Sequence, residues 1–285
     1  MRNQTPHRLS RRLSENSTSI LGKKLFWVKF SIHSRGGVKL VAGLLCDERW
    51  PMTTVRWACV LIVCMMGGFS GEAQAGKSRS ISALLKHWKR RPIRGLRHSV
   101  LRKALRAYQC ARRKRQTRRS LLTIIDYSKP SNHKRLWVLD LRRRKLLFRE
   151  WVAHGSRTGG RWAKRFSNRR QSRQTSLGVF LTSRTYRGKH GYSLRLKGLE
   201  RGFNHHAKVR AIVMHGAWYM SPRFIRKHKR AGRSWGCPAV RKRVSRRLIR
   251  RIRNGTIVFA YHDGKRHSSR YIRRWHRRSR YLRCR

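Results

Sequence analysis

The sequence predicts a mainly β protein, a sandwich or a barrel, preceded by a short helical region. The prediction rests on seven short apolar or alternating runs between residues 121 and 261, separated by clusters of Gly, Ser, Asn and Pro. The chain also contains 10 Trp, 9 Phe and 8 Tyr, which are enough to build a core. The expected strands are 121–126, 135–141, 145–153, 177–183, 192–196, 209–214 and 256–261.

The composition is extremely basic. The 285 residues include 75 Lys and Arg against 9 Asp and Glu, a formal net charge of +66. Such a charge density repels itself and requires anions nearby. The composition excludes a purely disordered basic tail, a collagen or coiled-coil repeat and a multi-span membrane protein, and it argues against an ordinary cytosolic enzyme. The length fits one domain with extensions or two small domains.

Residues 52–75 have the layout of a secretory signal peptide. An apolar run of 13 residues begins at Trp57, and an A-x-A cleavage pattern ends at Ala75. The run is shorter than the roughly 20 residues of a membrane helix. Because such a signal should begin a chain, we interpret residues 1–51 as a misassigned upstream extension and Met52 as the start. We therefore expect export to the periplasm or cell wall; a signal anchor or a buried hairpin is the alternative.

The basic region 76–120 is predicted to be helical, with an interruption at Pro92 and Gly95. The apolar residues that recur there at helical spacing are Ile81, Leu84, Leu85, Trp88, Val100, Leu101, Ala104, Leu105 and Tyr108. Its other faces are nearly all Arg and Lys, a pattern typical of a nucleic-acid or membrane-surface helix.

Two short helices are expected within the β region, which we place at residues 121–263. Ser221-Pro222 is a suitable N-cap and first turn for a helix over 224–228. A second helix over 244–253 would stop at Asn254-Gly255. The tail, residues 264–285, is polar and basic and is expected to be loosely held.

Three cysteines follow the predicted signal peptide: Cys110, Cys237 and Cys284. An odd number in an exported protein leaves at least one thiol free or pairs it between chains. Cys110 and Cys284 could form a disulfide, but the sequence does not decide this.

Cys237 and His215 are the candidate chemistry-bearing pair. The apolar run 211–214 ends in His215-Gly216, and Cys237 follows 22 residues later in a Gly-Cys-Pro turn. A thiol needs a base near neutral pH because its ordinary pKa is about 8.5. A His at a rigid strand end can supply that base, and the many Arg residues should favour the thiolate. The alternative is a small buried Cys and a structural His.

Several phrases in this order resemble the murein L,D-transpeptidase catalytic domain family of peptidoglycan enzymes. The similarity covers about residues 121–262, and its phrases are 125–132, 135–141, 152–155, 188–196, 211–216 and 232–240. The resemblance implies a β-sandwich catalytic domain. Two departures stand out: Trp235 replaces a His of the broader family, and Ala239 and Val240 occupy positions where Arg or Asn is frequent.

The resemblance also implies residue roles. Cys237 would attack the carbonyl of the third stem residue, His215 would carry the proton, and the Gly216 carbonyl would hold the imidazole tautomer. The main-chain N–H groups of Gly236 and Cys237 would stabilise the oxyanion. We interpret Ser234 as a turn-forming residue, with a supporting hydrogen bond as the alternative.

Four further residues in resembling phrases are candidates for lining a substrate cleft: His154, Tyr186, His190 and Arg195. For each of them a packed or solvated side chain is the alternative. No metal site is expected, because His205-His206 has no carboxylate or second Cys at ligand spacing, and no cofactor is expected.

The expected partners are peptidoglycan stem peptides and, through charge, anionic envelope polymers; no specific nucleic acid is expected. The acyl group would pass to an amine or to water. The rival hypothesis is an exported cationic protein with an inactive transpeptidase-like domain, which binds anionic polymers or nucleic acid through runs such as 112–119 and 270–280. The oligomeric state is left open.

Overall fold

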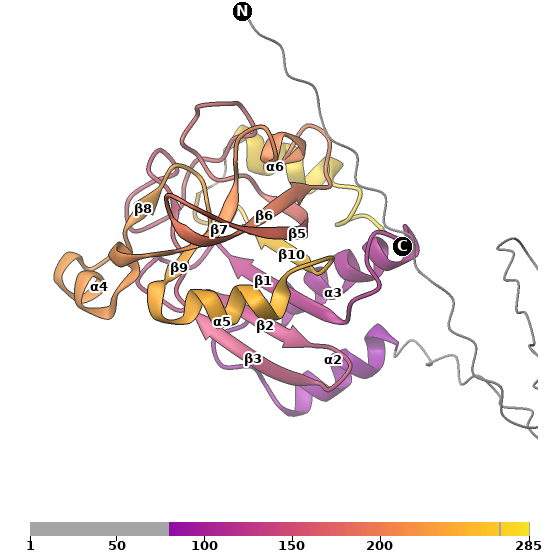
Figure 1. The fold of residues 1–285 in the computed structure, drawn as a ribbon. Helices are drawn as coiled ribbons and strands as arrows, with labels where there is room; N and C mark the ends of the chain where they lie inside the picture. The colour runs from indigo at the N-terminus through magenta and orange to yellow at the C-terminus, as the bar shows by residue number, and fades with distance from the viewer. Residues whose placement is uncertain (1–79, 268, 285) are drawn as a thin grey trace, which may run out of the picture. The chain divides into compact units, whose positions relative to one another are not determined.

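The computed structural model describes residues 80–267 and 269–284 (Figure 1). The predicted signal peptide and upstream extension lie outside this part. The helices are α2 (Ile81–Arg90), α3 (His98–Arg113), α4 (Pro222–His228), α5 (Lys242–Ile252) and α6 (Arg270–Arg278), with short 3-10 turns η1 (His205–Ala207) and η2 (Trp218–Met220). The strands are β1 (Leu121–Asp126), β2 (Leu136–Asp140), β3 (Lys145–Glu150), β4 (His154–Gly155), β5 (Gly178–Gly188), β6 (Gly191–Gly198), β7 (Val213–Ala217), β8 (Arg233–Ser234), β9 (Ala239–Arg241) and β10 (Ile257–Tyr261).

The strands form one large sheet and one small one, so the predicted mainly β fold is confirmed. The large sheet has eight strands in the order β3-β2-β1-β10-β5-β6-β7-β9. Its pairs are antiparallel except β1–β10 and β7–β9, which are parallel. The small sheet is the parallel pair β4–β8.

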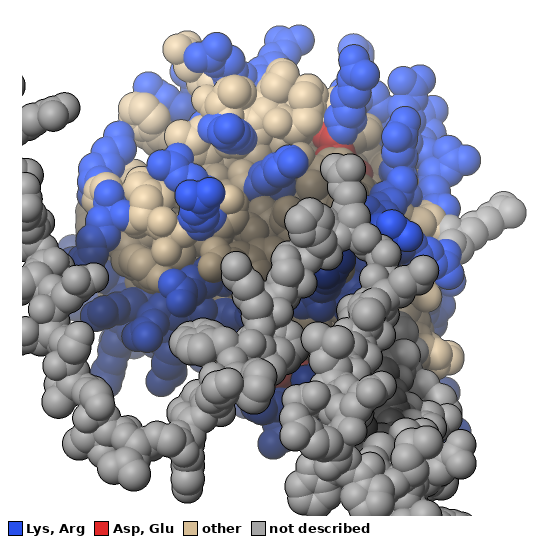
Figure 2. All heavy atoms as spheres, turned by 45° about the vertical axis from the view of Figure 1, so that its right-hand side comes forward, with Lys and Arg blue, Asp and Glu red and all other residues tan. Residues whose placement is uncertain are grey.

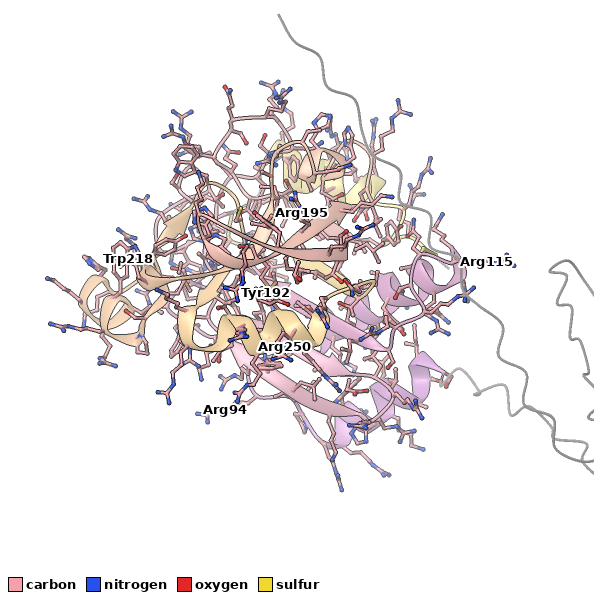
Figure 3. All side chains as sticks on the ribbon, in the orientation of Figure 1. Arg94, Arg115, Tyr192, Arg195, Trp218 and Arg250 are labelled. Carbon is pink, nitrogen blue, oxygen red and sulfur yellow. A yellow bond between two sulfur atoms is a disulfide. The ribbon has the colours of Figure 1, made fainter. Side chains whose placement is uncertain are left out.

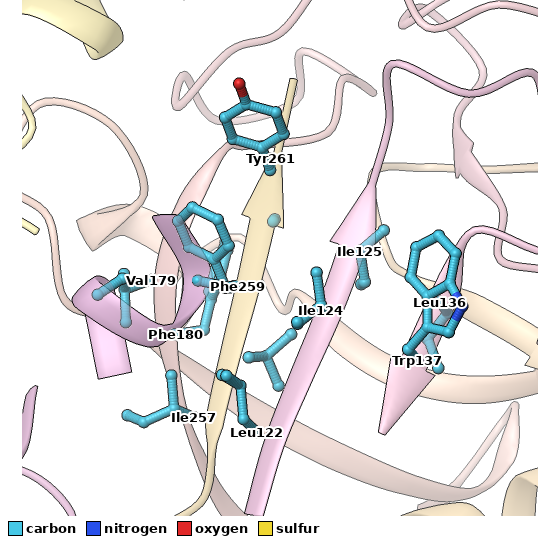
Figure 4. Packing of buried hydrophobic residues seen from close by; sticks show 14 of the residues in the cluster. Leu122, Ile124, Ile125, Leu136, Trp137, Val179, Phe180, Ile257, Phe259 and Tyr261 are labelled. Atoms are coloured by element: carbon cyan, nitrogen blue, oxygen red, sulfur yellow. The ribbon is translucent and has the colours of Figure 1, made fainter. Parts of the chain in front are cut away.

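The core lies on both faces of the central strands. β1 is buried along its whole length, which explains why its sequence is a continuous apolar run rather than an alternating one. Leu122 and Ile124 of β1 lie in register with Ile257 and Phe259 of β10 and pack beside them (Figure 4). Helix α3 contacts β1 and β10, while α5 contacts β6, β7 and β9.

The two predicted N-terminal helices are present as α2 and α3. Leu84 and Trp88 of α2 are buried, and seven residues of α3 are buried as well. All of them belong to the same hydrophobic cluster as the sheet. The apolar stripe read from the sequence therefore completes the core of the β domain, and only the opposite, basic faces meet solvent.

The prediction of a loosely held tail is wrong. Ser269 caps α6 by accepting a hydrogen bond from the Ile272 N–H, and Ile272 and Trp275 are fully buried. A disulfide joins Cys110 of α3 to Cys284. The basic composition of this segment conceals a one-sided apolar stripe, which anchors the C-terminal residues to the core.

All five carboxylates of the described residues have partners inside the fold: four are in ion pairs, and Glu200 accepts hydrogen bonds. The ion pairs are Arg97–Asp126, Arg97–Asp263, Arg241–Glu150 and Arg251–Asp140. Most of the other Lys and Arg side chains lie at the surface, and many of them are visible on the face in Figure 2. In the described part of the chain, no helix has the length and apolar character needed to cross a membrane.

Candidate active site

The parallel pairing of β7 with β9 brings the candidate base and nucleophile to one end of the sheet. His215 of β7 lies in register with Ala239 of β9. Cys237 lies two residues before Ala239, and Val213 lies two residues before His215. The parallel register therefore places Cys237 level with Val213. Residues two apart on a strand face the same side, so Val213 and His215 share the face that the thiol approaches.

Hydrogen bonds place the sulfur of Cys237 against the beginning of β7. The Val213 N–H donates to Sγ over 3.4 Å, and Sγ donates to the Ala211 carbonyl over 3.6 Å. The side chain is half-buried. The thiol is thus fixed beside the strand that carries His215, with part of its surface open to a reactant.

A tight turn presents Cys237. Gly236 has φ +121°, and a Cβ there would lie 2.8 Å from the Gln174 carbonyl oxygen, so the turn requires glycine. The Ser234 hydroxyl accepts from the Gly236 N–H over 3.1 Å and donates to the Cys237 carbonyl over 2.7 Å. Ser234 therefore closes the turn. Because the Gly236 N–H donates to Ser234, it is already engaged, although the family resemblance implied that it would bind the oxyanion.

His215 is 2% exposed and its tautomer is determined. Its Nδ1 lies 3.1 Å from the Gly216 carbonyl oxygen, which can only accept, so Nδ1 carries the hydrogen and Nε2 is the free base. Burial lowers the pKa of His215, and the neighbouring His190 lowers it further. The His190 ring, from the turn between β5 and β6, stacks on His215 with 4.4 Å between centroids.

The surroundings of Cys237 act on its thiol in opposite directions. Burial raises the pKa of Cys237, and the Val213 N–H, Arg210 and Lys189 only partly offset this effect. Arg210 and Lys189 favour the thiolate, as expected of basic surroundings, but desolvation of the buried sulfur outweighs their effect on the pKa. A thiol whose pKa is raised needs a base to accept its proton before it can act as a nucleophile.

Arg210 is a site residue that sequence reasoning missed. Its guanidinium donates to the Ser167 and Gln174 carbonyls over 2.8 and 2.5 Å, and it acts electrostatically on Cys237. The same side chain donates to the hydroxyls of Ser176 and Ser172. Among 75 Lys and Arg residues, nothing in the sequence distinguishes this one.

Tyr219 also approaches the thiol. Burial raises the pKa of Tyr219 to about 12, and Cys237 contributes to the shift. Its ring packs against Gly232, where a Cβ would come within 2.3 Å of Cδ2. This contact joins the segment after His215 to the segment before Cys237.

The other candidate cleft residues are distributed differently. The guanidinium of Arg195 lies over the ring of Tyr186 at 4.3 Å, so these two side chains, from β6 and β5, pair with each other. His154 is buried, and its Nδ1 and Nε2 contact Arg135 and the Gly159 carbonyl, which leaves no ring nitrogen for a ligand. Trp235 is strongly exposed.

No three His, Cys, Asp or Glu side chains gather as a metal site within residues 80–267 and 269–284. The chemistry available in the described site is that of a thiol, an imidazole and main-chain N–H groups. Such a combination defines a candidate Cys-His site for acyl transfer.

The chain belongs to the L,D-transpeptidase catalytic domain family, which it matches over residues 93–261. The match covers more than half of the chain, confirms the resemblance found in the sequence and includes α3 as well as the sheet. No curated protein matches the chain.

Several solved structures are similar. An L,D-transpeptidase from Mycobacterium smegmatis is 12% identical, with coverage of 50% of this chain and 58% of that one and a TM-score of 0.32. The helical cell shape determining protein Pgp2 from Campylobacter jejuni is 10% identical, with coverage of 54% and 55% and a TM-score of 0.30. An L,D-transpeptidase from Stackebrandtia nassauensis is 17% identical, with coverage of 63% and 76% and a TM-score of 0.30. The chain thus spans less than two thirds of the first two proteins.

Proposed function

We propose that the protein is an exported peptidoglycan L,D-transpeptidase with Cys237 as its nucleophile. The observation that supports this most directly is the hydrogen bond from the Val213 N–H to the Cys237 sulfur, over 3.4 Å. Val213 lies two residues before the buried His215, the proposed base, on the same strand. The family match supplies the reaction class.

The first half-reaction is acylation. The free Nε2 of His215 takes the thiol proton, and the sulfur of Cys237 attacks the carbonyl of the third stem residue. When the tetrahedral adduct collapses, the C–N bond to the terminal D-Ala breaks and His215 returns the proton to the leaving amine. The product is a thioester on Cys237.

The second half-reaction releases the enzyme. An amine of another stem gives its proton to His215 and attacks the thioester, so that an amide cross-link forms and the thiol is regenerated. Water in place of the amine gives a shortened stem instead.

Stabilisation of the tetrahedral oxyanion falls first to the Cys237 main-chain N–H. Within the described part of the chain this group donates to no other residue, whereas the Gly236 N–H donates to Ser234. A free N–H directed at the developing charge is the kind of donor that oxyanion stabilisation requires.

The test is digestion of tetrapeptide-stem muropeptides by the full chain. We expect release of D-Ala together with L,D cross-links or shortened stems, and a loss on the order of 10³-fold or more in Cys237→Ala and in His215→Ala. Arg250→Met, an exposed change on α5, is the matched control. Unchanged stems under reducing conditions, with a folded protein, contradict the proposal.

We also infer that the surface charge binds anionic envelope polymers. In support, four of the five carboxylates of the described residues are in internal ion pairs, so carboxylates of the described residues neutralise only a small part of the positive charge at the surface. Binding that persists in Cys237→Ala and falls with salt tests this role separately from catalysis.

A further inference from the structure

The described surface exposes very few large apolar side chains, and two of them are tryptophans. Trp218 is 71% exposed and Trp235 is 69% exposed; the others are Val209 and Leu146, at 61% and 40%. An indole buries a large apolar area when a ligand covers it, so two exposed indoles near one site offer a surface on which a ligand can stack.

Both tryptophans lie on the segments that carry the Cys-His site. Trp235 is two residues before Cys237, and Trp218 is three residues after His215. Trp218 lies at the end of β7 beside α4 (Figure 3). The Gly232 N–H donates to the Tyr219 carbonyl over 3.0 Å, which joins the two segments side by side.

The two rings are supported by contacts that leave part of each surface free. Trp218 meets Tyr219 and Phe224 edge-on, with centroids 5.8 and 5.6 Å apart and interplanar angles of 76° and 82°. The guanidinium of Arg173 lies 4.5 Å from the Trp235 ring. These contacts orient the indoles before any ligand arrives, which reduces the entropy lost on binding.

We propose that Trp218 and Trp235 form a platform that stacks the sugar rings of the glycan strand beside the Cys-His site. The proposal rests on the proposed function and extends it from the stem peptide to the sugar polymer that carries the stem.

The chemistry of the surface favours a sugar. A pyranose ring has an apolar C–H face, which suits an exposed indole, and a rim of hydroxyl and amide groups. Arg173 and the Trp235 N–H can bond that rim. A purely apolar partner would require a continuous apolar patch, whereas a charged guanidinium, that of Arg173, lies against the Trp235 ring.

The test measures how tightly the full chain binds N-acetylhexosamine strands that carry no peptide. All the proteins compared carry Cys237→Ala, and the salt concentration is 0.5 M, so that the net charge contributes little to binding. Trp218→Ala and Trp235→Ala should each weaken binding about tenfold, as expected for the loss of a stacked ring. Trp218→Phe and Trp235→Phe should retain most of the affinity. Leu146→Ala is the matched control, because Leu146 is an exposed apolar residue on β3, at the other edge of the sheet from β9.

The second measurement compares KM for a disaccharide-linked tetrapeptide with KM for the free tetrapeptide. The Trp→Ala changes should raise KM for the disaccharide-linked tetrapeptide and leave KM for the free tetrapeptide within about twofold of its original value. Unchanged glycan binding in both Trp→Ala variants, or an equal loss on both substrates, overturns the platform. If the unsubstituted protein turns over neither substrate while glycan binding still depends on the tryptophans, the transpeptidase proposal fails and the platform stands.

Discussion

Arg135 donates a hydrogen bond to Nδ1 of His154 over 2.8 Å, although the two side chains are 0% and 1% exposed. Burial, reinforced by Arg135, lowers the pKa of His154 to about 3, so the imidazole stays neutral and accepts. The guanidinium also donates to the Val152 and Lys129 carbonyls. This buried pair fixes β4, the strand that pairs with β8 just before the Cys237 turn.

Replacing Arg135 by Met should lower the free energy of unfolding by about 2–4 kcal/mol, because the buried carbonyls and the His154 nitrogen lose their donor. Urea denaturation measures this, with Arg250→Met on the exposed face of α5 as a control that should change stability by about 0.5 kcal/mol at most. An unchanged unfolding midpoint in Arg135→Met would show that the buried guanidinium is not needed for the fold.

Glu200 should make stability depend on pH. It accepts hydrogen bonds from Val179, Trp275 and Ser279, and burial raises its pKa to about 7. Since the folded pKa is raised, its contribution is fully present below the unfolded value of about 4.5 and is lost as pH rises through about 7.

The advantage of the natural protein over Glu200→Gln in unfolding free energy should therefore shrink between pH 5 and pH 8, by on the order of 1–3 kcal/mol. Other titrating groups such as His154 are common to both proteins and cancel in the difference. Parallel pH profiles for the two proteins would contradict the assignment.

Arg210 should assist ionisation of the thiol. Because burial raises the pKa of Cys237 and Arg210 opposes this, Arg210→Met should slow alkylation of Cys237 by iodoacetamide at pH 8, by about three- to tenfold. Peptide mass spectrometry follows Cys237 separately from the other cysteines. Arg210→Lys should retain part of the alkylation rate, and the control Arg250→Met should retain all of it. Equal rates for Met and Lys at position 210 would exclude a charge effect.

The disulfide between Cys110 and Cys284 should be a major source of stability. The two residues are separated by 174 positions, so the bridge closes a long loop. Cys284→Ser should lower the free energy of unfolding by about 2–5 kcal/mol. Reduction of the natural protein should have a similar effect, whereas it should leave Cys284→Ser unchanged. A reduced natural protein with an undiminished unfolding midpoint would refute this.

Much of the fold follows from local sequence patterns. The bounds of β1 were predicted because a strand buried on both faces is a continuous apolar run. The helix that begins at Ser221-Pro222 was predicted because its cap is a local signal, and the Ser221 hydroxyl indeed accepts from the Phe224 N–H. The two-residue strands β4 and β8 have no periodicity to detect, and α6 was missed because seven of its nine residues are Arg, His or Tyr.

The site was predictable only in part. His215 and Cys237 stand in distinctive phrases, whereas the burial of His154, the role of Arg210 and the pairing of Cys110 with Cys284 depend on contacts between distant segments. The predicted strand at 209–214 begins too early, because the chain turns through Ala211, at φ +51°, before β7 begins at Val213. Sequence patterns report local preference, and these features are set by packing.

Because β7 and β9 pair directly, the alignment of His215 with the strand that follows Cys237 does not depend on the length of chain between them. The hairpin-like excursion through η2, α4 and β8 leaves β7 and returns as β9. Residues could be added to or removed from the α4 excursion over evolutionary time without altering the register that aligns His215 with Ala239. A slip of one residue in the ladder would instead turn the imidazole to the opposite face.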